Sequence, residues 1–365
     1  MINNRGSAEN IRPLQVEKSI VYNCSEHQWH YSHHPNITYF NNMYYAMWSC
    51  AIKDEDYIGQ QVLMSTSKDT VLWSEPTLLF ASQSDNDAYT AVGWYLRPDG
   101  LLNAYASIYY VDETGEKETH YGNTVLCRTT ADGINWSEYI DLHIPCTPNI
   151  APRRLAGGRL IMCGHVTFPY TDDPYGIDGW KIAGISPVLP DGLVDDPVNG
   201  PKYFKMRGEE WYLLEADFFQ TPDECIHMLF RNSNPRNIEE KALCLCESTD
   251  NGVTYSEPHQ IDYSDNESKF NCLRLSDGRY AIISNPEKIG GRCPLSILIS
   301  NDGENFSTRY DIATEPIPLK FEGRYKTNGV YGYPNAVEAN GMLTVIASIQ
   351  KEDICVFRFA VSDLK

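Results

Sequence analysis

Apolar and polar positions alternate along most of this chain, and short polar turns interrupt the alternation at regular intervals. The segment 30–49, HYSHHPNITYFNNMYYAMWS, shows the unit, because two apolar-rich stretches flank an Asn-Asn pair. A period of two is typical of β-strands, whose successive side chains point to opposite faces of a sheet. The same alternation occurs in ALCLCES (242–248) and SILIS (296–300), and no helical repeat competes with it. The pattern therefore predicts an all-β protein.

This strand–turn–strand unit occurs six times, at intervals of 54 to 66 residues. The turns centre on Asn42, Gly100, Gly158, Glu224, Gly278 and Gly341. Repeats of this length are typical of propellers, in which each blade is a four-stranded antiparallel sheet. The sequence predicts a six-bladed β-propeller that forms one domain over residues 1–365, with residues 1–18 as an N-terminal extension or a closing strand.

A second motif lies between the hairpins: Ser or Thr, any residue, Asp, and an aromatic residue four or five positions after the Asp. Its four copies are Asp69 with Trp73, Asp132 with Trp136, Asp250 with Tyr255, and Asp302 with Phe306. The carboxylate can cap backbone N–H groups of a turn while the aromatic ring packs into the blade. We expect a structural role for these residues. A degenerate copy is expected at Asp191, and the irregular stretch 167–180 is expected to be a rim loop over the site.

Four such motifs in phase with a six-fold strand repeat resemble the Asp-box, or BNR, repeats of the sialidase (neuraminidase) superfamily. The resemblance covers nearly the whole chain. It implies a sialidase-like propeller with a catalytic site where the inner strands begin. It also implies an exo-acting glycoside hydrolase that cleaves a terminal bond in a sialic acid- or uronate-containing glycan.

Composition narrows the choice of partners. With 30 basic and 49 acidic residues the net charge is −19, which disfavours nucleic acid and anionic membranes as partners. An acidic oligosaccharide or polysaccharide would then need a local group of cations. The abundant aromatics, 24 Tyr, 12 Phe and 7 Trp, suit both β structure and sugar-facing surfaces.

The sequence contains no clear targeting segment and no common metal-binding motif. Residues 1–19 lack the apolar centre of a signal peptide, and the eleven cysteines show no framework spacing. We expect a cytoplasmic protein with reduced thiols, or a periplasmic or secreted one if a leader was removed. No HExxH, paired CxxC or EF-hand sequence occurs, so no cofactor or metal is expected. The sequence does not give the oligomeric state.

Residues at equivalent depth in the six units should meet around the axis. Counting back eight or nine positions from three of the turns reaches His33, Glu215 and Tyr333. Asp217 shares a strand face with Glu215 and is the alternative carboxylate. Adjacent strand residues face opposite ways, so we expect one of His33 and His34 to face the axis and the other to pack between blades.

The resemblance assigns catalytic roles to some of these positions. Tyr333, with Tyr331 as the alternative, matches the nucleophilic tyrosine that opens the last inner strand. Glu215 matches the glutamate that deprotonates it. Asp56, with Asp54 as the alternative, lies in the loop after the first hairpin, where the family has its general acid.

Candidate substrate-binding residues come from the same comparison and from strand alternation. Arg231, sixteen residues after Glu215, and Arg292 match two arginines that hold the substrate carboxylate in sialidases. Arg154 on the third inner strand and His165 after its hairpin are further candidates.

The first arginine of the sialidase pattern is absent. True sialidases begin with Arg-Ile-Pro, whereas this chain has His33-His34-Pro35 at that place. The site then also resembles that of rhamnose–glucuronate lyases and hydrolases, in which a histidine is catalytic. This keeps His33 and His34 as catalytic candidates and leaves two alternatives open, β-elimination at a uronate and a non-catalytic glycan-binding propeller.

Overall fold

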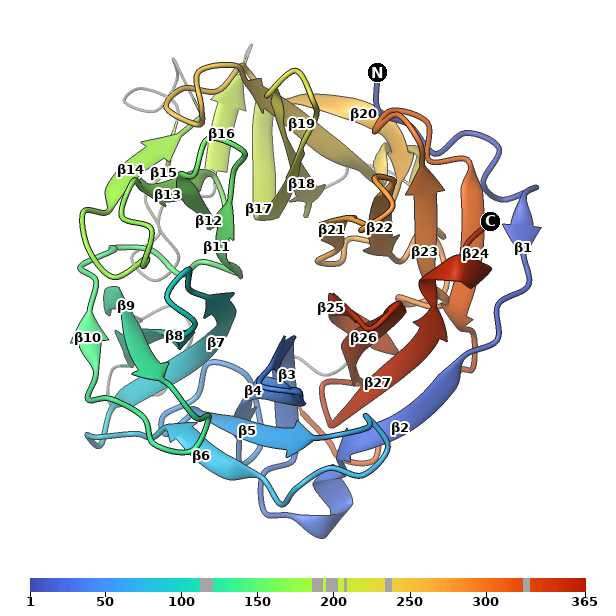
Figure 1. The fold of residues 1–365 in the computed structure, drawn as a ribbon. Coiled ribbons are helices and arrows are strands. Elements are labelled where there is room, and N and C mark those ends of the chain that lie inside the picture. The colour runs from blue at the N-terminus through green and yellow to red at the C-terminus, as the bar shows by residue number, and fades with distance from the viewer. Residues whose placement is uncertain (112–120, 186–192, 195–202, 207–208, 234–237, 324–328) are drawn as a thin grey trace.

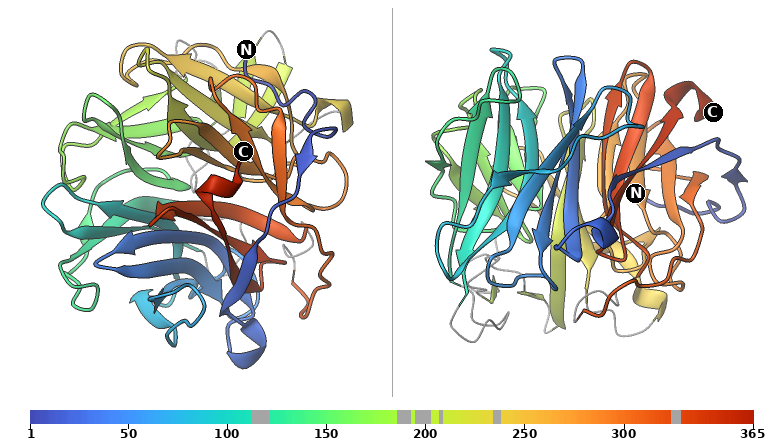
Figure 2. Two further views of the ribbon diagram at one scale, coloured as in Figure 1. Left: turned by 45° about the vertical axis from the view of Figure 1, so that its right-hand side comes forward. Right: turned by 90° about the horizontal axis from the view of Figure 1, so that it is seen from below.

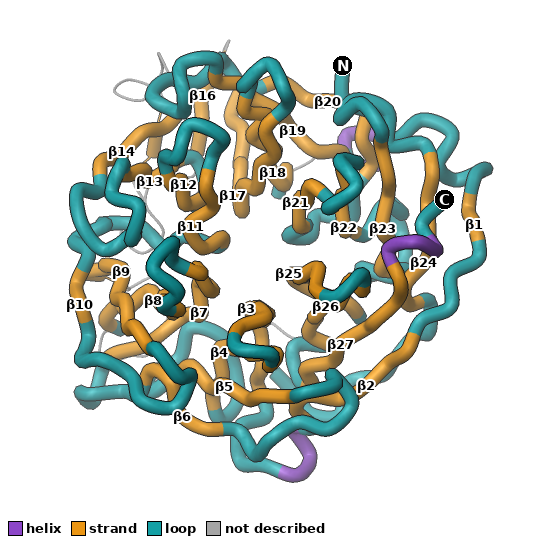
Figure 3. The backbone as a smooth tube through the Cα atoms, in the orientation of Figure 1, coloured by secondary structure: helices purple, strands orange, loops and turns teal. Residues whose placement is uncertain are grey.

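The computed structural model describes residues 1–365 except 112–120, 186–192, 195–202, 207–208, 234–237 and 324–328. Six antiparallel sheets stand around a common axis like blades, with the first strand of each blade innermost (Figure 1). The prediction of a six-bladed, all-β propeller is confirmed. Three-residue 3-10 turns, Cys24–Glu26, Ile238–Glu240 and Val361–Asp363, are the helical segments among the described residues (Figure 3).

Each blade is described from its inner strand outward. The first blade contains β3 (Tyr31–Phe40), β4 (Met43–Ala51), β5 (Gln61–Ser67) and β6 (Thr77–Phe80). The second contains β7 (Asp87–Leu96), β8 (Leu102–Tyr110), β9 (Tyr121–Thr130) and β10 (Ile140–Asp141). The third contains β11 (Ile150–Arg154), β12 (Leu160–Cys163), β13 (Thr167–Thr171) and β14 (Lys181–Gly184).

The other three blades carry additions to this plan. The fourth contains β17 (Glu209–Gln220), β18 (Ile226–Asn232), β19 (Ala242–Ser248) and β20 (His259–Ser264), and its sheet extends through β16 (Tyr203–Met206) and β15 (Leu193–Val194). The fifth contains β21 (Asn271–Arg274), β22 (Tyr280–Ser284), β23 (Leu295–Ser300) and β24 (Thr308–Ala313), with β1 (Ile11–Arg12) at its outer edge. The sixth contains β25 (Tyr331–Ala339), β26 (Met342–Ile349) and β27 (Asp353–Ala360).

The beginning of the chain supplies the outer strand of the sixth blade. Strand β2 (Glu17–Tyr22) pairs antiparallel with β27, so the first and last parts of the chain share one sheet. Both views in Figure 2 show this segment running along the outside of the C-terminal blades. The last blade is therefore built from two ends of the chain, and this pairing closes the ring.

Apolar side chains fill the seams between neighbouring blades. Both faces of an inner strand are buried, as in β7, whose residues Asp87–Tyr95 are all buried. The seam between the sixth and first blades contains Val21 and Tyr22 from β2 together with Trp48 and Ile346. Burying such side chains provides most of the favourable free energy of folding, and here the contribution is spread around the ring.

The Asp-box residues cap turns between the third and fourth strands of their blades. Asp132 Oδ1 accepts hydrogen bonds from the backbone N–H groups of Ile134 and Asn135, both at 2.8 Å. These donors hold the pKa of Asp132 well below its ordinary value. Asp69, Asp250 and Asp302 accept backbone N–H groups in the same manner.

The third blade shows that the rim-loop prediction was wrong. The stretch 167–180 contains β13, and its turn lies at the opposite end of the blade from the start of β11, so it is no rim loop over the site. Asp173 in this turn accepts the N–H groups of Tyr175 and Ile177, and Trp180 packs against the blade. The segment TDDPYGIDGW (171–180) is therefore the third blade's equivalent of the Asp-box. Its Asp173 and Trp180 are further apart than in the other copies, so the motif did not match it. Asp191, the expected copy, lies outside the described residues.

Among the described residues, no helix has the length and apolar character needed to cross a bilayer.

Candidate active site

Three inner strands carry a β-bulge at the same depth, and each bulge places one side chain of the site. The register of β3, β17 and β25 against its partner shifts between His33 and Asn36, between Leu214 and Asp217, and between Gly332 and Asn335. Within these bulges His34, Glu215 and Tyr333 have φ values of 53°, 50° and 55°. Left-handed backbone is uncommon for such residues, and strain of this kind often occurs at functional sites.

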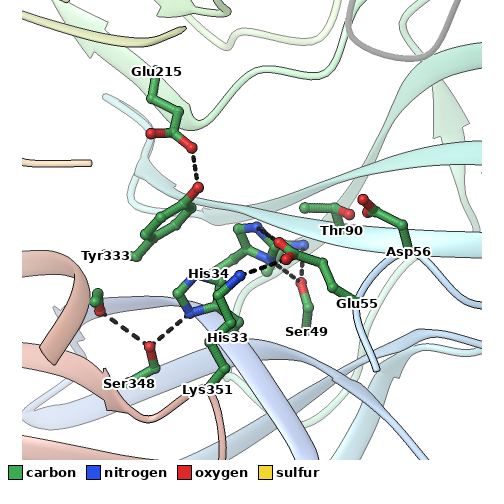
Figure 4. Close-up of polar contacts among 12 residues, drawn as sticks. His33, His34, Ser49, Glu55, Asp56, Thr90, Glu215, Tyr333, Ser348 and Lys351 are labelled. Atoms are coloured by element: carbon green, nitrogen blue, oxygen red, sulfur yellow. Dashed lines mark hydrogen bonds and ion pairs between the residues drawn. The ribbon is translucent and has the colours of Figure 1, made fainter. Parts of the chain in front are cut away.

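Glu215 and Tyr333 meet although 118 residues separate them. The Tyr333 hydroxyl donates a hydrogen bond to Glu215 Oε1 (Figure 4). Arg231, from β18, donates to Glu215 Oε2 at 2.7 Å. Burial alone would raise the pKa of Glu215, but the Arg231 guanidinium outweighs it and holds this pKa below the ordinary value. The carboxylate is therefore ionised at neutral pH and in contact with a phenol that it can deprotonate.

His165 supports the backbone at Glu215. Its Nδ1 accepts a hydrogen bond from the Glu215 N–H at 3.0 Å. The accepting nitrogen carries no proton in this tautomer, and the ring faces the bulge that aims Glu215 at Tyr333. His165 thus contacts the catalytic candidate through its backbone, which gives it a positioning role.

Three cations surround the Glu215–Tyr333 pair. Besides Arg231, Arg292 lies with Cζ 5.8 Å from the centre of the Tyr333 ring, and Lys269 with Nζ 5.9 Å from it. Burial lowers the pKa of Arg292 to about 10 and that of Lys269 to about 8. Cations that are buried at such cost gain from an anion placed between them.

His33 is the last paired residue before the first bulge, and His34 lies within it. His33 is fully buried at the seam with the sixth blade, where its Nδ1 is 2.6 Å from Ser348 Oγ. His34 retains 14% of its side-chain exposure, and its Nδ1 is 3.1 Å from Ser49 Oγ. Their ring centres lie 4.0 Å and 5.1 Å from that of Tyr333. The bulge suspends the alternation, which lets two adjacent side chains approach one tyrosine.

The loop after β4 brings an acid that the sequence analysis did not select. Glu55 Oε2 accepts from Lys351 Nζ at 2.5 Å, and Glu55 Oε1 lies 3.4 Å from His34 Nε2 (Figure 4). Asp56, the predicted general acid, accepts a hydrogen bond from the Tyr109 hydroxyl at 2.6 Å instead. Asp54 accepts the Glu55 N–H at 2.8 Å and so supports the loop.

The structure does not bring Arg154 to this cluster. Arg154 is exposed near the turn at Gly158, at the other end of β11. Its neighbour Arg153 points inward, where it pairs with the fully buried Asp217 and donates to the carbonyl of Cys272 at 2.7 Å. Asp217 therefore belongs to a tie between blades and does not replace Glu215.

Tyr331 also lies apart from the other candidates. Its hydroxyl donates to the Glu315 carbonyl at 2.9 Å, and its ring packs in the seam of the fifth and sixth blades. Strand alternation alone would put Tyr331 and Tyr333 on the same face, and the bulge after Gly332 separates them.

His33, His34 and Glu55 have ligand atoms close enough to consider a metal ion. The ammonium group of Lys351 already lies 2.5 Å from Glu55. A lysine cation against the only carboxylate of this trio opposes a second cation there, so these residues do not fit a metal site.

Lys269, Glu55 and Lys351 are the functional candidates that sequence reasoning missed. Lys269 lies two positions before β21 and is 2% exposed. It lies nine positions before the turn at Gly278, the same offset that Glu215 has from its own turn, so the repeat register could have revealed it. Glu55 and Lys351 lie in connections between strands, for which the register gives no depth.

Fold and site together define a six-bladed, sialidase-like β-propeller. The chain belongs to the family described as the BNR repeat-like domain, which matches residues 43–345. No curated protein sequence matches it.

Solved structures share this architecture at low identity. A protein of unknown function from Dyadobacter fermentans is 16% identical with a TM-score of 0.68, over 94% of this chain and 99% of that one. A chain described as a sialidase is 19% identical with a TM-score of 0.66, and the match covers 99% of this chain and 34% of that one. A leech intramolecular trans-sialidase complexed with 2,7-anhydro-Neu5Ac is 12% identical with a TM-score of 0.64, over 95% of this chain and 71% of that one. Identities this low establish the fold alone.

Proposed function

We propose that this protein is a glycoside hydrolase of the sialidase superfamily that cleaves a terminal acidic sugar from a glycan. The observation that carries the proposal is the hydrogen bond from the Tyr333 hydroxyl to Glu215, with Arg231 on the other carboxylate oxygen. A nucleophile, its base and a cation that orients the base are the parts that covalent catalysis requires.

The residue types suit an anionic substrate. A carboxylate nucleophile would be repelled by a sugar carboxylate, whereas Tyr333 is neutral until it reacts. Its oxygen bonds to the anomeric carbon while its proton passes to Glu215 and the glycosidic C–O bond breaks. Water then releases the sugar by the reverse sequence of proton transfers.

Arg231, Arg292 and Lys269 supply the positive charge that a sugar carboxylate would meet. Arginine offers two parallel donors to a carboxylate, and lysine adds a point charge. These cations are local, because the chain as a whole has a net charge of −19. These local cations would attract an acidic sugar although the negative net charge of the protein repels it.

Asp56 is the proposed proton donor to the leaving oxygen. Its loop also holds Glu55 beside His34, so the segment lies next to the Tyr333 ring. The ion pair with Lys351 favours an ionised Glu55, and an ionised carboxylate cannot donate a proton. Asp56 accepts a hydrogen bond from the neutral Tyr109 hydroxyl at 2.6 Å.

A lyase is the second candidate, and His34 is the observation that favours it. Burial lowers the pKa of His34 to about 4, so the imidazole is neutral at pH 7 and can accept a proton. In β-elimination His34 or Tyr333 would take the proton α to a uronate carboxylate, and the arginines would stabilise the resulting anion.

Incubation with sialosides, rhamnose–glucuronate fragments and other acidic oligosaccharides tests both reactions. Mass spectrometry separates them, because hydrolysis products together exceed the substrate by one water and elimination products do not. New ultraviolet absorbance from an unsaturated sugar marks elimination. Absence of cleavage across the panel, with glycan binding retained, would leave a glycan-binding propeller.

Substitution of the central pair tests the hydrolase mechanism. Tyr333→Phe and Glu215→Gln should each reduce kcat by about 10²–10⁴-fold, the range for removing a group that transfers a proton in the transition state. Tyr331→Phe is the matched control two residues away, since its hydroxyl faces the Glu315 carbonyl. Equal losses in Tyr331→Phe and Tyr333→Phe would contradict the assignment.

A further inference from the structure

A second group of ligand-type side chains lies in the fourth blade, away from the cluster around Tyr333. Cys225 immediately precedes β18, His227 is the second residue of β18, and Glu247 lies opposite His227 on β19. Their sulfur, nitrogen and oxygen atoms all fall within 4.8 Å of one another. Four residues along β18 separate His227 from Arg231, which is roughly 13 Å at the usual strand rise.

The hydrogen bonds around His227 determine which ring nitrogen is open. Thr221 Oγ1 lies 2.5 Å from Asp223 Oδ1 and donates its proton to that carboxylate. The same hydroxyl lies 3.0 Å from His227 Nε2, so it accepts the Nε2–H. The Nδ1 atom of a neutral ring then presents a lone pair, and it faces Glu247 Oε1 at 2.8 Å.

Two lone pairs at that separation require a cation between them. His227 Nδ1 is buried and makes no hydrogen bond of acceptable geometry, although it is close to the Glu247 carboxylate. Either a proton or a metal ion satisfies it. The thiol of Cys225 is the third group facing this point, and a thiol is a ligand for a metal but a poor acceptor for a proton.

We propose that Cys225, His227 and Glu247 bind a zinc ion at the seam between the fourth and fifth blades. Sulfur, imidazole nitrogen and carboxylate oxygen are the ligands that zinc prefers. Zinc bonds of about 2.0–2.3 Å would draw the three atoms together by roughly 1 Å. Cys225 can move toward the ion, because it lies at the hairpin end of β18 and outside the paired strand.

The surroundings support a metal in two further ways. A metal-bound imidazole usually donates its other N–H to a fixed acceptor, and the Thr221–Asp223 pair provides one. The local charge is negative, since the carboxylates of Asp223 and Glu247 lie close enough to Cys225 to help raise the pKa of its thiol. Glu247 keeps 42% of its side-chain exposure, which gives the ion a route from solvent.

The ion would be structural. It would join the β17–β18 hairpin end to β19, and water can complete the coordination as a fourth ligand. Binding converts the Cys225 thiol to a thiolate and displaces the proton held between His227 Nδ1 and Glu247 in the metal-free site, so two protons pass to the buffer for each zinc bound. Because binding selects the folded state, zinc should also raise the midpoint of thermal unfolding.

Cobalt is the probe for the thiolate ligand. Protein treated with a chelator and then titrated with Co²⁺ should develop thiolate-to-cobalt charge-transfer absorption in the near ultraviolet. The absorption should saturate at one ion per chain and disappear when Zn²⁺ is added. Calorimetry of Zn²⁺ binding in buffers of different ionisation enthalpy should report two released protons, one from the Cys225 thiol and one from between His227 and Glu247.

Variants assign the ligands. Cys225→Ser and His227→Gln should abolish the charge-transfer band. Thr221→Val should weaken Zn²⁺ binding by about 10–100-fold, the usual effect of removing a residue that hydrogen-bonds to a metal ligand. Cys293→Ser is the control, because Cys225 and Cys293 are the two cysteines of eleven that are not buried. Chelator-treated variants are compared with chelator-treated wild type in thermal unfolding, so that misfolding is recognised.

Absence of a cobalt–thiolate band in folded protein would overturn the proposal and leave a protonated His227 paired with Glu247. A band that persists in Cys225→Ser, or that is lost in Cys293→Ser, would overturn it as well.

Discussion

At the scale of single residues, Lys269 is the one of the three cations around Tyr333 whose charge changes closest to neutral pH. Burial lowers its pKa from 10.5 to about 8, while Asp217 and Glu215 oppose the shift. Lys269 is therefore charged below about pH 8 and neutral above it. Arg292, whose pKa burial lowers to about 10, loses its charge only in more alkaline solution.

This difference predicts the pH dependence of substrate binding. KM for an acidic substrate should rise as pH increases through about 8, because Lys269 loses its positive charge. In Lys269→Met that rise should be absent and KM should be elevated at pH 7 by about 10-fold or more, the value of a hydrogen bond to a charged group. Steady-state kinetics from pH 6 to 9.5 provide the measurement.

Lys68→Met is the control, since Lys68 is exposed on the first blade. An unchanged alkaline limb in Lys269→Met would show that another group controls binding.

At the scale of elements, the inner strands hold the site through ties between blades as well as through bulges. Arg153 in β11 contacts Asp217 in β17 and the Cys272 carbonyl in β21, so one side chain connects three blades. Asp217 is fully buried, and its second oxygen accepts the Cys272 N–H at 2.8 Å. Removing Arg153 would leave a buried carboxylate without its cation.

We therefore expect Arg153→Met to lower the free energy of unfolding by about 3–5 kcal/mol, the usual cost of breaking a buried ion pair by deleting one partner. Arg154→Met, one residue further along β11, should change it by less than about 0.5 kcal/mol, because Arg154 is exposed. Urea denaturation of both variants provides the comparison. Similar effects of the two substitutions would argue against the tie.

The strands could be predicted from the sequence wherever apolar and polar residues alternate with a period of two. The six hairpins, the four Asp-boxes and the spacing of Glu215 and Arg231 could all be found in the sequence. The bulges could not, because a single inserted residue leaves the apolar pattern almost unchanged while reversing which side chain faces the axis. For that reason the alternation favours Arg154 where Arg153 points inward. Glu55 lies in the connection after β4, for which the register gives no depth.

At the scale of the whole molecule, the ring closes through β2. Tyr22 is 1% exposed between the sixth and first blades, and its hydroxyl donates to the Trp29 carbonyl at 2.8 Å. Ile20, two residues earlier in the same strand, is 52% exposed. Tyr22 thus fixes a strand that comes from the other end of the chain.

Closure should make unfolding cooperative. Tyr22→Ala should lower the free energy of unfolding by about 3–5 kcal/mol, as for other large buried aromatics, and unfolding should remain a single transition. Ile20→Ala should stay within about 0.5 kcal/mol of wild type. Denaturation followed by both far-ultraviolet circular dichroism and tryptophan fluorescence provides the test, and an early separate transition in Tyr22→Ala would contradict cooperative closure.

The left-handed bulge residues have a consequence for how this scaffold can change its chemistry. At positions 34, 215 and 333 the direction of the side chain is set by the backbone, and the partners come from other blades. The side chain at each of these positions can therefore be replaced without changing the direction in which it points. A small library at these three positions would sample new reactivities in an unchanged spatial frame, provided that it omits the β-branched residues, which tolerate positive φ poorly.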